Sequence, residues 1–348
     1  MKNILFTLIC VFCALVLLSG CNSTPVQQAE RAMLPALPVS KELLNKRAET
    51  LRSVLAPMPL RGAGIKLSAY RHKVLPGKEI ISLVKTLGFN RIYCYISSEK
   101  ELSDDLTDLL VKASEAKIPV ELFIRQGDFK RRLRGNALVR VLLPPFRTLP
   151  DLAEEIADFN DSLPDNAKLA GVTVRFEPHL FTYANGADKI PGLNYAWDKN
   201  TFGPGLDNDQ LTSLSIELLK QMKKNLQGLP LSVELPDFYP LWVSEKKLTR
   251  GKVSDFSAIG KVIIQCSGNR PSELVKLTAA AMSESKNTMV VIPLAEHTSV
   301  RTGALRRRNW TDLVRAVGFF INSARKNNCS GVILRPLSEL GYMLLEQE

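Results

Sequence analysis

Three glutamates stand near the ends of strand-like segments in this sequence. Glu177 closes the alternating stretch GVTVRFE, Glu234 lies near the end of LPLSVELP, and Glu296 lies near the end of TMVVIPLAEH. Paired carboxyl groups in a cleft are the minimum for glycoside hydrolysis. One protonated acid donates to the leaving oxygen, while an ionised one attacks the anomeric carbon or activates water. Glu177, Glu234 and Glu296 are therefore the candidate catalytic residues, and this chemistry needs no cofactor.

Arginines close to these acids allow another interpretation. Arg175 precedes Glu177 by two positions, Arg125 ends the strand-like run IPVELFIR, and Arg335 lies in GVILRPL. A neighbouring guanidinium keeps a carboxyl group ionised and lowers its pKa, whereas a general acid needs a raised pKa. The alternative is that the glutamates pair with the arginines, in a structural role or beside arginines that bind substrate carboxylates.

The segments that must position these residues alternate between strand-like and helical patterns. Eight strand-like runs cover residues 64–70, 91–97, 118–125, 171–178, 229–236, 261–268, 288–297 and 331–337. Most are separated by amphipathic helical patterns, although the pattern before the sixth run is weak. Their number and order favour an α/β fold of the (β/α)8 TIM-barrel type over an open doubly wound sheet. The sequence also lacks the glycine-rich phosphate motifs of nucleotide-binding sheets.

In such a barrel the functional side chains gather at the carboxyl ends of the strands. Alternation along each run predicts which side chains reach that mouth beside the glutamates. Strand seven is ambiguous, since either Glu296 or His297 faces inward. Lys66, Glu121 and Arg175 are expected deeper, as a charged layer that pairs internally. The candidate substrate-binding residues are Tyr70, Tyr93, Tyr95, Arg125, Arg175, Gln265 and Arg335.

One segment resembles a known group of proteins. DFNDSLPDNAKLAGVTVRFEPH is similar to a segment of bacterial lipoproteins whose TIM-barrel domain resembles glycoside hydrolases, with the strand-four pattern G-V-x-x-D-x-E-P-[HY]. ELP at 234–236 and LAEH at 294–297 correspond to further motifs on strands five and seven. The resemblance spans most of residues 61–340, and only the strand-four segment is specific. It implies a barrel in which Glu177 is the acid and Glu296 or Glu234 its partner.

Two positions depart from that pattern. The aspartate two residues before the glutamate is Arg175 here, and the strand-five aspartate position holds Glu234. In chitinase-like barrels the first aspartate helps to position the substrate amide, so its loss argues against that mechanism. A relative that binds glycan, or organises an envelope complex, without catalysis is therefore the alternative to a hydrolase.

Basic side chains cluster in the segments expected around the mouth. They lie at 130–147, at 246–252 and at 301–308, in a chain of formal net charge +11. Positive charge around a site attracts acidic ligands, which suits acidic glycans, teichoic-type polymers or anionic lipid headgroups; the alternative is a merely solvated basic surface. Trp197 and its aromatic neighbours, in the long loop after the fourth strand, suit a sugar-stacking lid or the loop's own small core.

The first residues have the features of a secretory signal. Lys2 precedes an apolar run, and LSGC at 18–21 resembles a bacterial lipobox, which implies cleavage before Cys21 and lipidation of that cysteine. Asn22 goes with outer-membrane delivery if the cell is Gram-negative. We expect a signal peptide at 1–20, a tether at 21–60 and the barrel domain at 61–348. The protein is thus expected to be a membrane-anchored lipoprotein of the cell envelope, with an unlipidated signal or an uncut anchor as alternatives.

The cysteines and histidines indicate neither a disulfide scaffold nor a metal site. Beyond Cys21 only Cys94, Cys266 and Cys329 remain, and their number and apolar surroundings predict buried thiols. No CxxC or histidine-rich spacing suggests a metal. The expected partners are a polysaccharide, the membrane through the Cys21 lipid and other envelope proteins. Nucleic acid is not expected for an envelope lipoprotein.

Overall fold

The predicted barrel is present in the computed structural model, which describes residues 41–68, 77–126, 149–180, 206–266, 288–294, 309–326 and 329–345, with Val275 and Ala279. Eight parallel strands follow one another in chain order and close on themselves. They are β1 (Leu60–Lys66), β2 (Arg91–Ile96), β3 (Val120–Arg125), β4 (Gly171–Arg175), β5 (Leu231–Pro236), β6 (Lys261–Gln265), β7 (Met289–Pro293) and β8 (Gly331–Arg335). The fold is a (β/α)8 TIM barrel, as the spacing of the apolar runs predicts.

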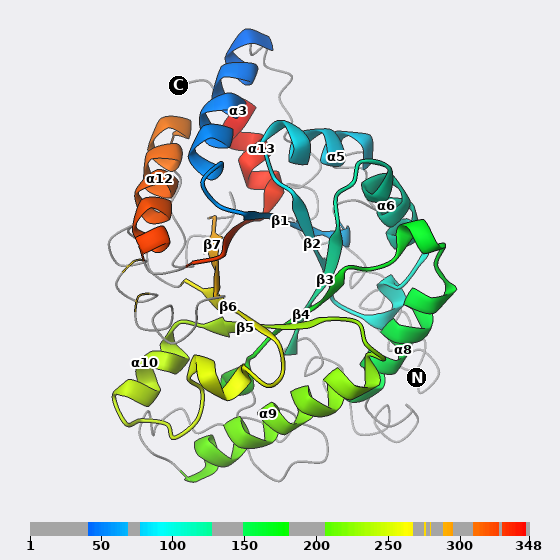
Figure 1. Ribbon diagram of the computed structural model, residues 1–348, viewed down its shortest axis with the longest axis vertical. Coiled ribbons are helices and arrows are strands. Elements are labelled where there is room, and N and C mark those ends of the chain that lie inside the picture. The colour runs from blue at the N-terminus through cyan, green and yellow to red at the C-terminus, as the bar shows by residue number, and fades with distance from the viewer. Residues whose placement is uncertain are drawn as a thin grey trace, which may run out of the picture. The chain divides into compact units, whose positions relative to one another are not determined.

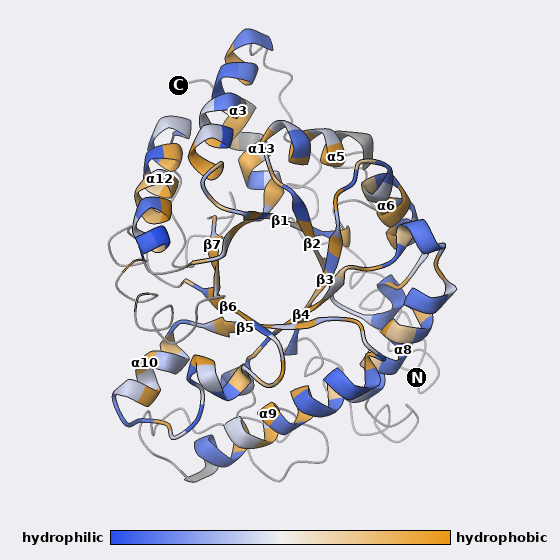
Figure 2. Cartoon of the chain, viewed as in Figure 1, coloured by the Kyte–Doolittle hydropathy of each residue, from blue (hydrophilic) through white to orange (hydrophobic). Residues whose placement is uncertain are grey.

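Helices surround the barrel (Figure 1). The described helices are α3 (Lys41–Leu55), α5 (Gly77–Thr86), α6 (Asp104–Glu115), α8 (Leu149–Ser162), α9 (Leu206–Asn225), α10 (Phe238–Ser244), α12 (Trp310–Lys326) and α13 (Leu337–Leu345). Figure 2 shows hydrophilic and hydrophobic residues interleaved along these helices, as expected where one helix face is buried. In the view of Figure 1 the strands run clockwise from β1 to β8. Because crossovers between parallel strands are right-handed, this view looks onto the amino ends of the strands.

The connection from β5 to β6 explains the weak helical pattern there. It contains the short helix α10 and one turn of 3-10 helix, η5 (Val253–Phe256), in place of a long amphipathic helix. Aromatic packing anchors this connection to the barrel. Phe176, just after β4, contacts Tyr239 of α10 and Phe256 of η5, each at a ring-centroid distance of 5.0 Å. All three rings are fully buried, so the connection covers β4 and β5 without a full-length helix.

Residues 41–58 form part of the folded unit. Leu51, Leu55 and Met58 are fully buried in the main hydrophobic core. Arg47 Nη1 donates to the carbonyl of Leu344 in α13 at 2.9 Å, which ties the two ends of the described chain together. Within the segment expected as a tether, residues 21–60, α3 therefore packs on the barrel. The helical periodicity near residues 41–54 is the sequence feature that indicates this helix.

The interior of the barrel is filled by side chains. Its middle is an apolar layer made of Tyr93, Phe123, Ile263, Met289, Val291 and Ile333, each at most 5% exposed. Outside the sheet, a larger core lies between strands and helices. The three cysteines predicted to be buried thiols are free and buried. Among the described helices, none is both long and apolar enough to cross a membrane.

Candidate functional site

Charged side chains gather at the carboxyl ends of β3, β4, β5 and β8. We call Arg125, Arg175, Glu177, Glu234 and Arg335 the arginine–glutamate cluster. The strand register sets three of them side by side, because Arg125 pairs with Arg175 and Arg175 with Glu234 across neighbouring strands. Four of these side chains, Arg125, Glu177, Glu234 and Arg335, are predicted at the mouth from the sequence, whereas Arg175 is predicted deeper and instead contacts both glutamates.

Glu234 is the most enclosed member of the cluster. Its residue is 1% exposed, and both carboxylate oxygens accept hydrogen bonds from guanidinium groups. Arg335 Nη2 lies 2.5 Å from Oε1 and Nη1 lies 2.6 Å from Oε2, a bidentate pair. Arg175 Nε donates to Oε1 at 2.6 Å. Two cations thus hold one buried anion, in the planar geometry that suits guanidinium and carboxylate groups.

Glu177 is held by two arginines as well. Its Oε1 accepts from Arg125 Nη2 at 3.0 Å and Nε at 3.3 Å, and Arg175 Nη1 lies 3.5 Å away. Arg175 therefore bridges the two carboxylates. The Glu177 side chain is 4% exposed and that of Arg125 is 33% exposed, so solvent reaches Arg125 more readily than the acid it holds.

The cluster carries an excess of positive charge. Three arginines face two glutamates, and the guanidinium group stays protonated in proteins. Burial by itself would raise the pKa of Glu234, but Arg335 and Arg175 outweigh it and hold that pKa below its ordinary value. Glu234 is therefore ionised near neutral pH, which is the opposite of what a general acid requires.

Neighbouring residues leave room for the arginines and orient them. Gly64 of β1 faces Arg335, and a Cβ atom at this glycine would lie 2.4 Å from Arg335 Cβ. Beneath the cluster, the Phe123 ring lies 4.5 Å from Arg335 Cζ and 5.5 Å from Arg175 Cζ. Buried Gln126, directly after β3, accepts the backbone N–H of Glu177 at 2.9 Å. These contacts fix the cluster from below and from the side.

Other predicted mouth residues lie at different depths. Tyr93 is 3% exposed in the apolar layer, and its Oη lies 3.6 Å from Met289 Sδ, so it does not reach the mouth. Tyr95 lies one step higher and packs on Phe123 at 5.8 Å between ring centroids. Gln265 is half-buried at the end of β6, and its backbone carbonyl accepts the N–H of Asp237.

The expected deep charged layer of Lys66, Glu121 and Arg175 is not a single layer. Lys66 is exposed at the end of β1, and Arg175 belongs to the arginine–glutamate cluster. Glu121 lies near the amino end and pairs with Arg91. The reason is the stagger of the strands, which sets Lys66 level with Tyr95, and Glu121 level with Tyr93 and Gly171.

Several predicted residues lie outside the part of the chain that the structure describes. The third candidate acid, Glu296, is among them, as are His297 and the loop holding Trp197. The other predictions that fall outside it concern Tyr70, Cys21 and the basic segments at 130–147 and 301–308.

Two polar groups near the site were not identified from the sequence. Asp237 follows β5 directly and is 1% exposed. Tyr239 accepts the backbone N–H of His179 at 3.2 Å, and its Oη lies 3.0 Å from His179 Nδ1, which joins the segment after β4 to the connection after β5. Burial raises the pKa of Tyr239 well above its ordinary value, so it stays a neutral phenol. Their position directly after predicted strands was the available signal.

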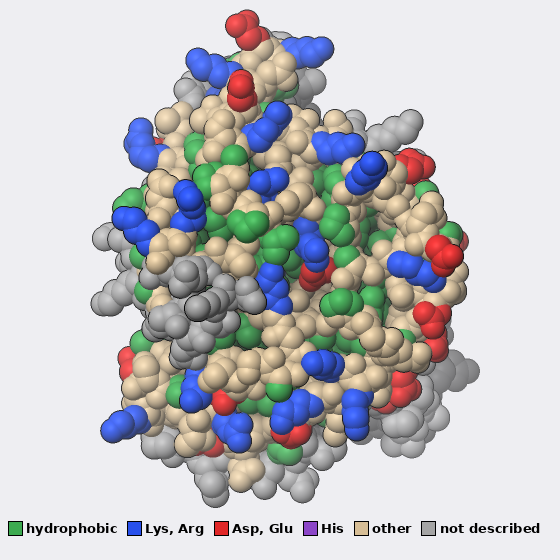
Figure 3. Space-filling model, viewed as in Figure 1, with side chains coloured by type: hydrophobic (Ala, Val, Ile, Leu, Met, Phe, Trp, Pro, Cys, Tyr) green, Lys and Arg blue, Asp and Glu red, His purple; other side chains and the backbone are tan. Residues whose placement is uncertain are grey.

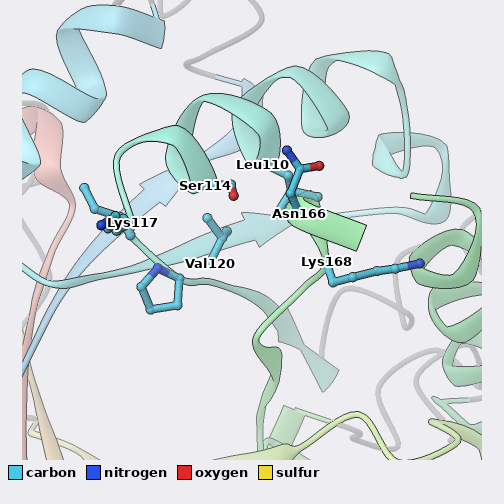
Figure 4. A pocket seen from close by; sticks show the side chains of 8 residues that line it. Leu110, Ser114, Lys117, Val120, Asn166 and Lys168 are labelled. Carbon is cyan, nitrogen blue, oxygen red and sulfur yellow. The ribbon is translucent and has the colours of Figure 1, made fainter. Parts of the chain in front are cut away.

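Among the residues that the structure describes, neither a metal site nor the hollow of Figure 4 coincides with this cluster. In the described part of the chain, no three His, Cys, Asp or Glu side chains are grouped to hold a metal ion. Figure 4 shows a hollow of about 160 Å³ beside α6 and the start of β3. Its Lys168 points outward and donates to the carbonyls of Asn160 and Asp161. That hollow therefore lies on the helical surface, away from the barrel mouth.

The sequence matches no family model and no curated protein. Several solved structures with a similar fold are glycoside hydrolases. A psychrophilic family 10 endo-β-1,4-xylanase has a TM-score of 0.49 and 9% identity, over 82% of this chain and 88% of that chain. The catalytic domain of psychrophilic chitinase B from Arthrobacter TAD20 has a TM-score of 0.47 and 11% identity, over 84% and 95%. Tryptophan synthase from Mycobacterium tuberculosis also matches, with a TM-score of 0.40 and 11% identity, over 86% of this chain and 92% of that chain. Likeness at this level carries no argument about activity.

Proposed function

We propose that the protein binds an acidic polysaccharide of the cell envelope at the carboxyl end of its barrel, and that Glu177 and Glu234 are not its catalytic acids. The observation that carries the proposal is the pairing of both buried carboxylates with Arg125, Arg175 and Arg335. A glycosidase needs one acid that is protonated at working pH. The cluster instead holds Glu234 in its ionised form and pairs Glu177 with Arg125 and Arg175.

Arg125 is the member of the cluster that is most accessible to a ligand. Its side chain is the most exposed of the three arginines, at 33% against 13% for Arg175 and 14% for Arg335. A guanidinium group binds carboxylate and phosphate oxygens with paired hydrogen bonds. Uronic acids and phosphorylated sugars carry such groups, whereas neutral glycans do not.

Affinity electrophoresis tests the proposal. Polygalacturonate in the gel should retard the protein more than a neutral galactomannan does, and Arg125→Gln should remove most of that difference. Arg315→Gln is the matched control, because this exposed arginine on α12 changes net charge equally but lies on an outer helix. Equal retardation by both polymers, or an equal effect of the two variants, would contradict binding at the cluster.

Reducing-end release separates binding from hydrolysis. The binding proposal predicts no release from acidic or neutral polymers above that of heat-inactivated protein. Release that disappears in Glu177→Gln would establish catalysis by that residue instead. Release that disappears only in Glu296→Gln would place the acid on strand seven.

The envelope location is part of the same proposal and rests on the lipobox-like LSGC segment. Cys21→Ser should remove lipid labelling and shift the protein out of the membrane fraction. Persistent labelling of this variant would show that Cys21 is not the lipidated residue.

A further inference from the structure

A second group of charges fills the opposite end of the barrel. We call Arg91 of β2, Glu121 of β3, Thr173 of β4 and Lys261 of β6 the amino-end ring. Glu121 Oε1 accepts from Arg91 Nη1, and its Oε2 accepts from Thr173 Oγ1 at 2.7 Å. Lys261 begins β6, and the charges of both Glu121 and Arg91 act on its ammonium group. One carboxylate therefore faces two cations.

Two donors of this ring lack acceptors among the described residues. The Nε atom of Arg91 is buried and has no hydrogen-bond partner there. The structure likewise gives the Lys261 ammonium no hydrogen bond or ion pair within the described part of the chain. Leaving the buried Arg91 Nε unpaired costs free energy, more so because the group is charged. An anion on the ring would pair with the Lys261 ammonium and with the exposed part of the Arg91 guanidinium, and would balance the excess charge of the ring.

The ring is separate from the mouth and accessible from outside. The apolar layer that includes Tyr93, Phe123 and Met289 lies between it and the arginine–glutamate cluster, so a ligand enters from the amino end. Figure 3 looks onto that end, and basic side chains surround an acidic one near the centre of the visible face. The Arg91 side chain is 24% exposed, which agrees with a site open to small ions.

We propose that the amino-end ring binds a small tetrahedral oxyanion, phosphate or sulfate, between Lys261 and Arg91. Tetrahedral oxyanions offer several acceptor oxygens at once, and Arg and Lys are the side chains that bind them. This site is independent of the polysaccharide proposal, because it lies at the other end of the barrel and uses none of the same residues.

Calorimetric titration of the full chain with inorganic phosphate, at ionic strength held constant with sodium chloride, tests the site. We expect saturable binding of one phosphate per chain, and a loss of about tenfold or more in affinity for Lys261→Gln. Lys224→Gln is the matched control, because it removes the same charge from an exposed position of α9. Absence of saturable binding, or equal losses in the two variants, would overturn the proposal.

A measurement on the unmodified protein covers the case in which Lys261→Gln does not fold. Lysine methylation with formaldehyde and a borohydride, followed by peptide mass spectrometry, reports the reactivity of each amine. Phosphate should protect Lys261 several-fold while Lys224 reacts at an unchanged rate. Equal modification of Lys261 with and without phosphate would contradict the site.

Discussion

At the scale of single residues, the two buried glutamates differ in how fully the protein encloses them. Glu234 has a bidentate pair with Arg335 and a further hydrogen bond from Arg175. Glu177 relies on Arg125, whose side chain is one third exposed, and on a longer contact with Arg175. Breaking a buried ion pair is costly because it leaves an uncompensated charge, and solvent reduces that cost.

Replacing each acid with glutamine should therefore lower the free energy of unfolding by different amounts, with the larger loss at Glu234. Glu234→Gln should lower the free energy of unfolding by roughly 3–5 kcal/mol, since Arg335 and Arg175 lose a shared buried partner. Glu177→Gln should cost less, about 1–2 kcal/mol, because water can solvate Arg125. Urea unfolding of the two variants and the unmodified protein measures both. A greater loss for Glu177→Gln would contradict this account of the cluster.

The pH dependence of stability should change with Glu234. The arginines hold its pKa below the ordinary value of 4.5, despite the opposing effect of burial. A carboxyl group with a depressed folded-state pKa contributes stability above its unfolded pKa and loses that contribution as pH falls through the folded pKa. The stability difference between the unmodified protein and Glu234→Gln should thus be constant above about pH 5 and shrink below it. Glu217→Gln, at an exposed site on α9, should show little difference at any pH.

At the scale of secondary-structure elements, α3 extends the folded unit beyond the barrel strands. Its buried face includes Ala48, Leu51 and Leu55, and Arg47 reaches α13 through the Leu344 carbonyl. A flexible tether would not bury apolar side chains against the barrel in this way. We infer that a chain beginning near residue 60 would expose core residues of the barrel.

Leu51→Ala should test that contribution. Leu51 is fully buried, so its truncation should cost about 2–5 kcal/mol through lost burial and a residual cavity. Leu43→Ala on the same helix removes the same atoms from a residue that is 38% exposed, and should change stability by about 0.5 kcal/mol or less. Thermal or urea unfolding of both variants gives the comparison. Similar small effects would mean that α3 does not stabilise the barrel.

The elements were more predictable from sequence than the site. Most strands show as short apolar runs between helical patterns, and the number and order of these runs favour a closed barrel. The depth of an inward-facing side chain is another matter, because it depends on strand stagger, which no local pattern encodes. For this reason Tyr93 was expected at the mouth and Arg175 below it, whereas Tyr93 is buried and Arg175 bridges Glu177 and Glu234.

At the scale of the whole molecule, the barrel has basic groups at both ends of its interior. The arginine–glutamate cluster and the amino-end ring each carry one more cation than anion. The formal net charge is +11. Such a molecule attracts acidic polymers over distances set by the ionic strength. Whether binding is specific therefore depends on where the charges lie, and not on their sum.

Two variants that lose the same number of charges separate the effect of where the charges lie from the effect of the net charge. Replacing Arg306, Arg307 and Arg308 with Gln removes three charges from the segment expected after strand seven. Replacing Lys220, Lys223 and Lys224 with Gln removes three from α9. At roughly 0.5 kcal/mol for each exposed charge, the first variant should bind polygalacturonate about tenfold more weakly at low salt. The second should retain most of its affinity. The difference in affinity between the two variants should disappear near 1 M salt, where the screening length is only about 3 Å. Equal losses in the two variants would mean that the polymer responds to net charge alone, with no preferred side of the barrel.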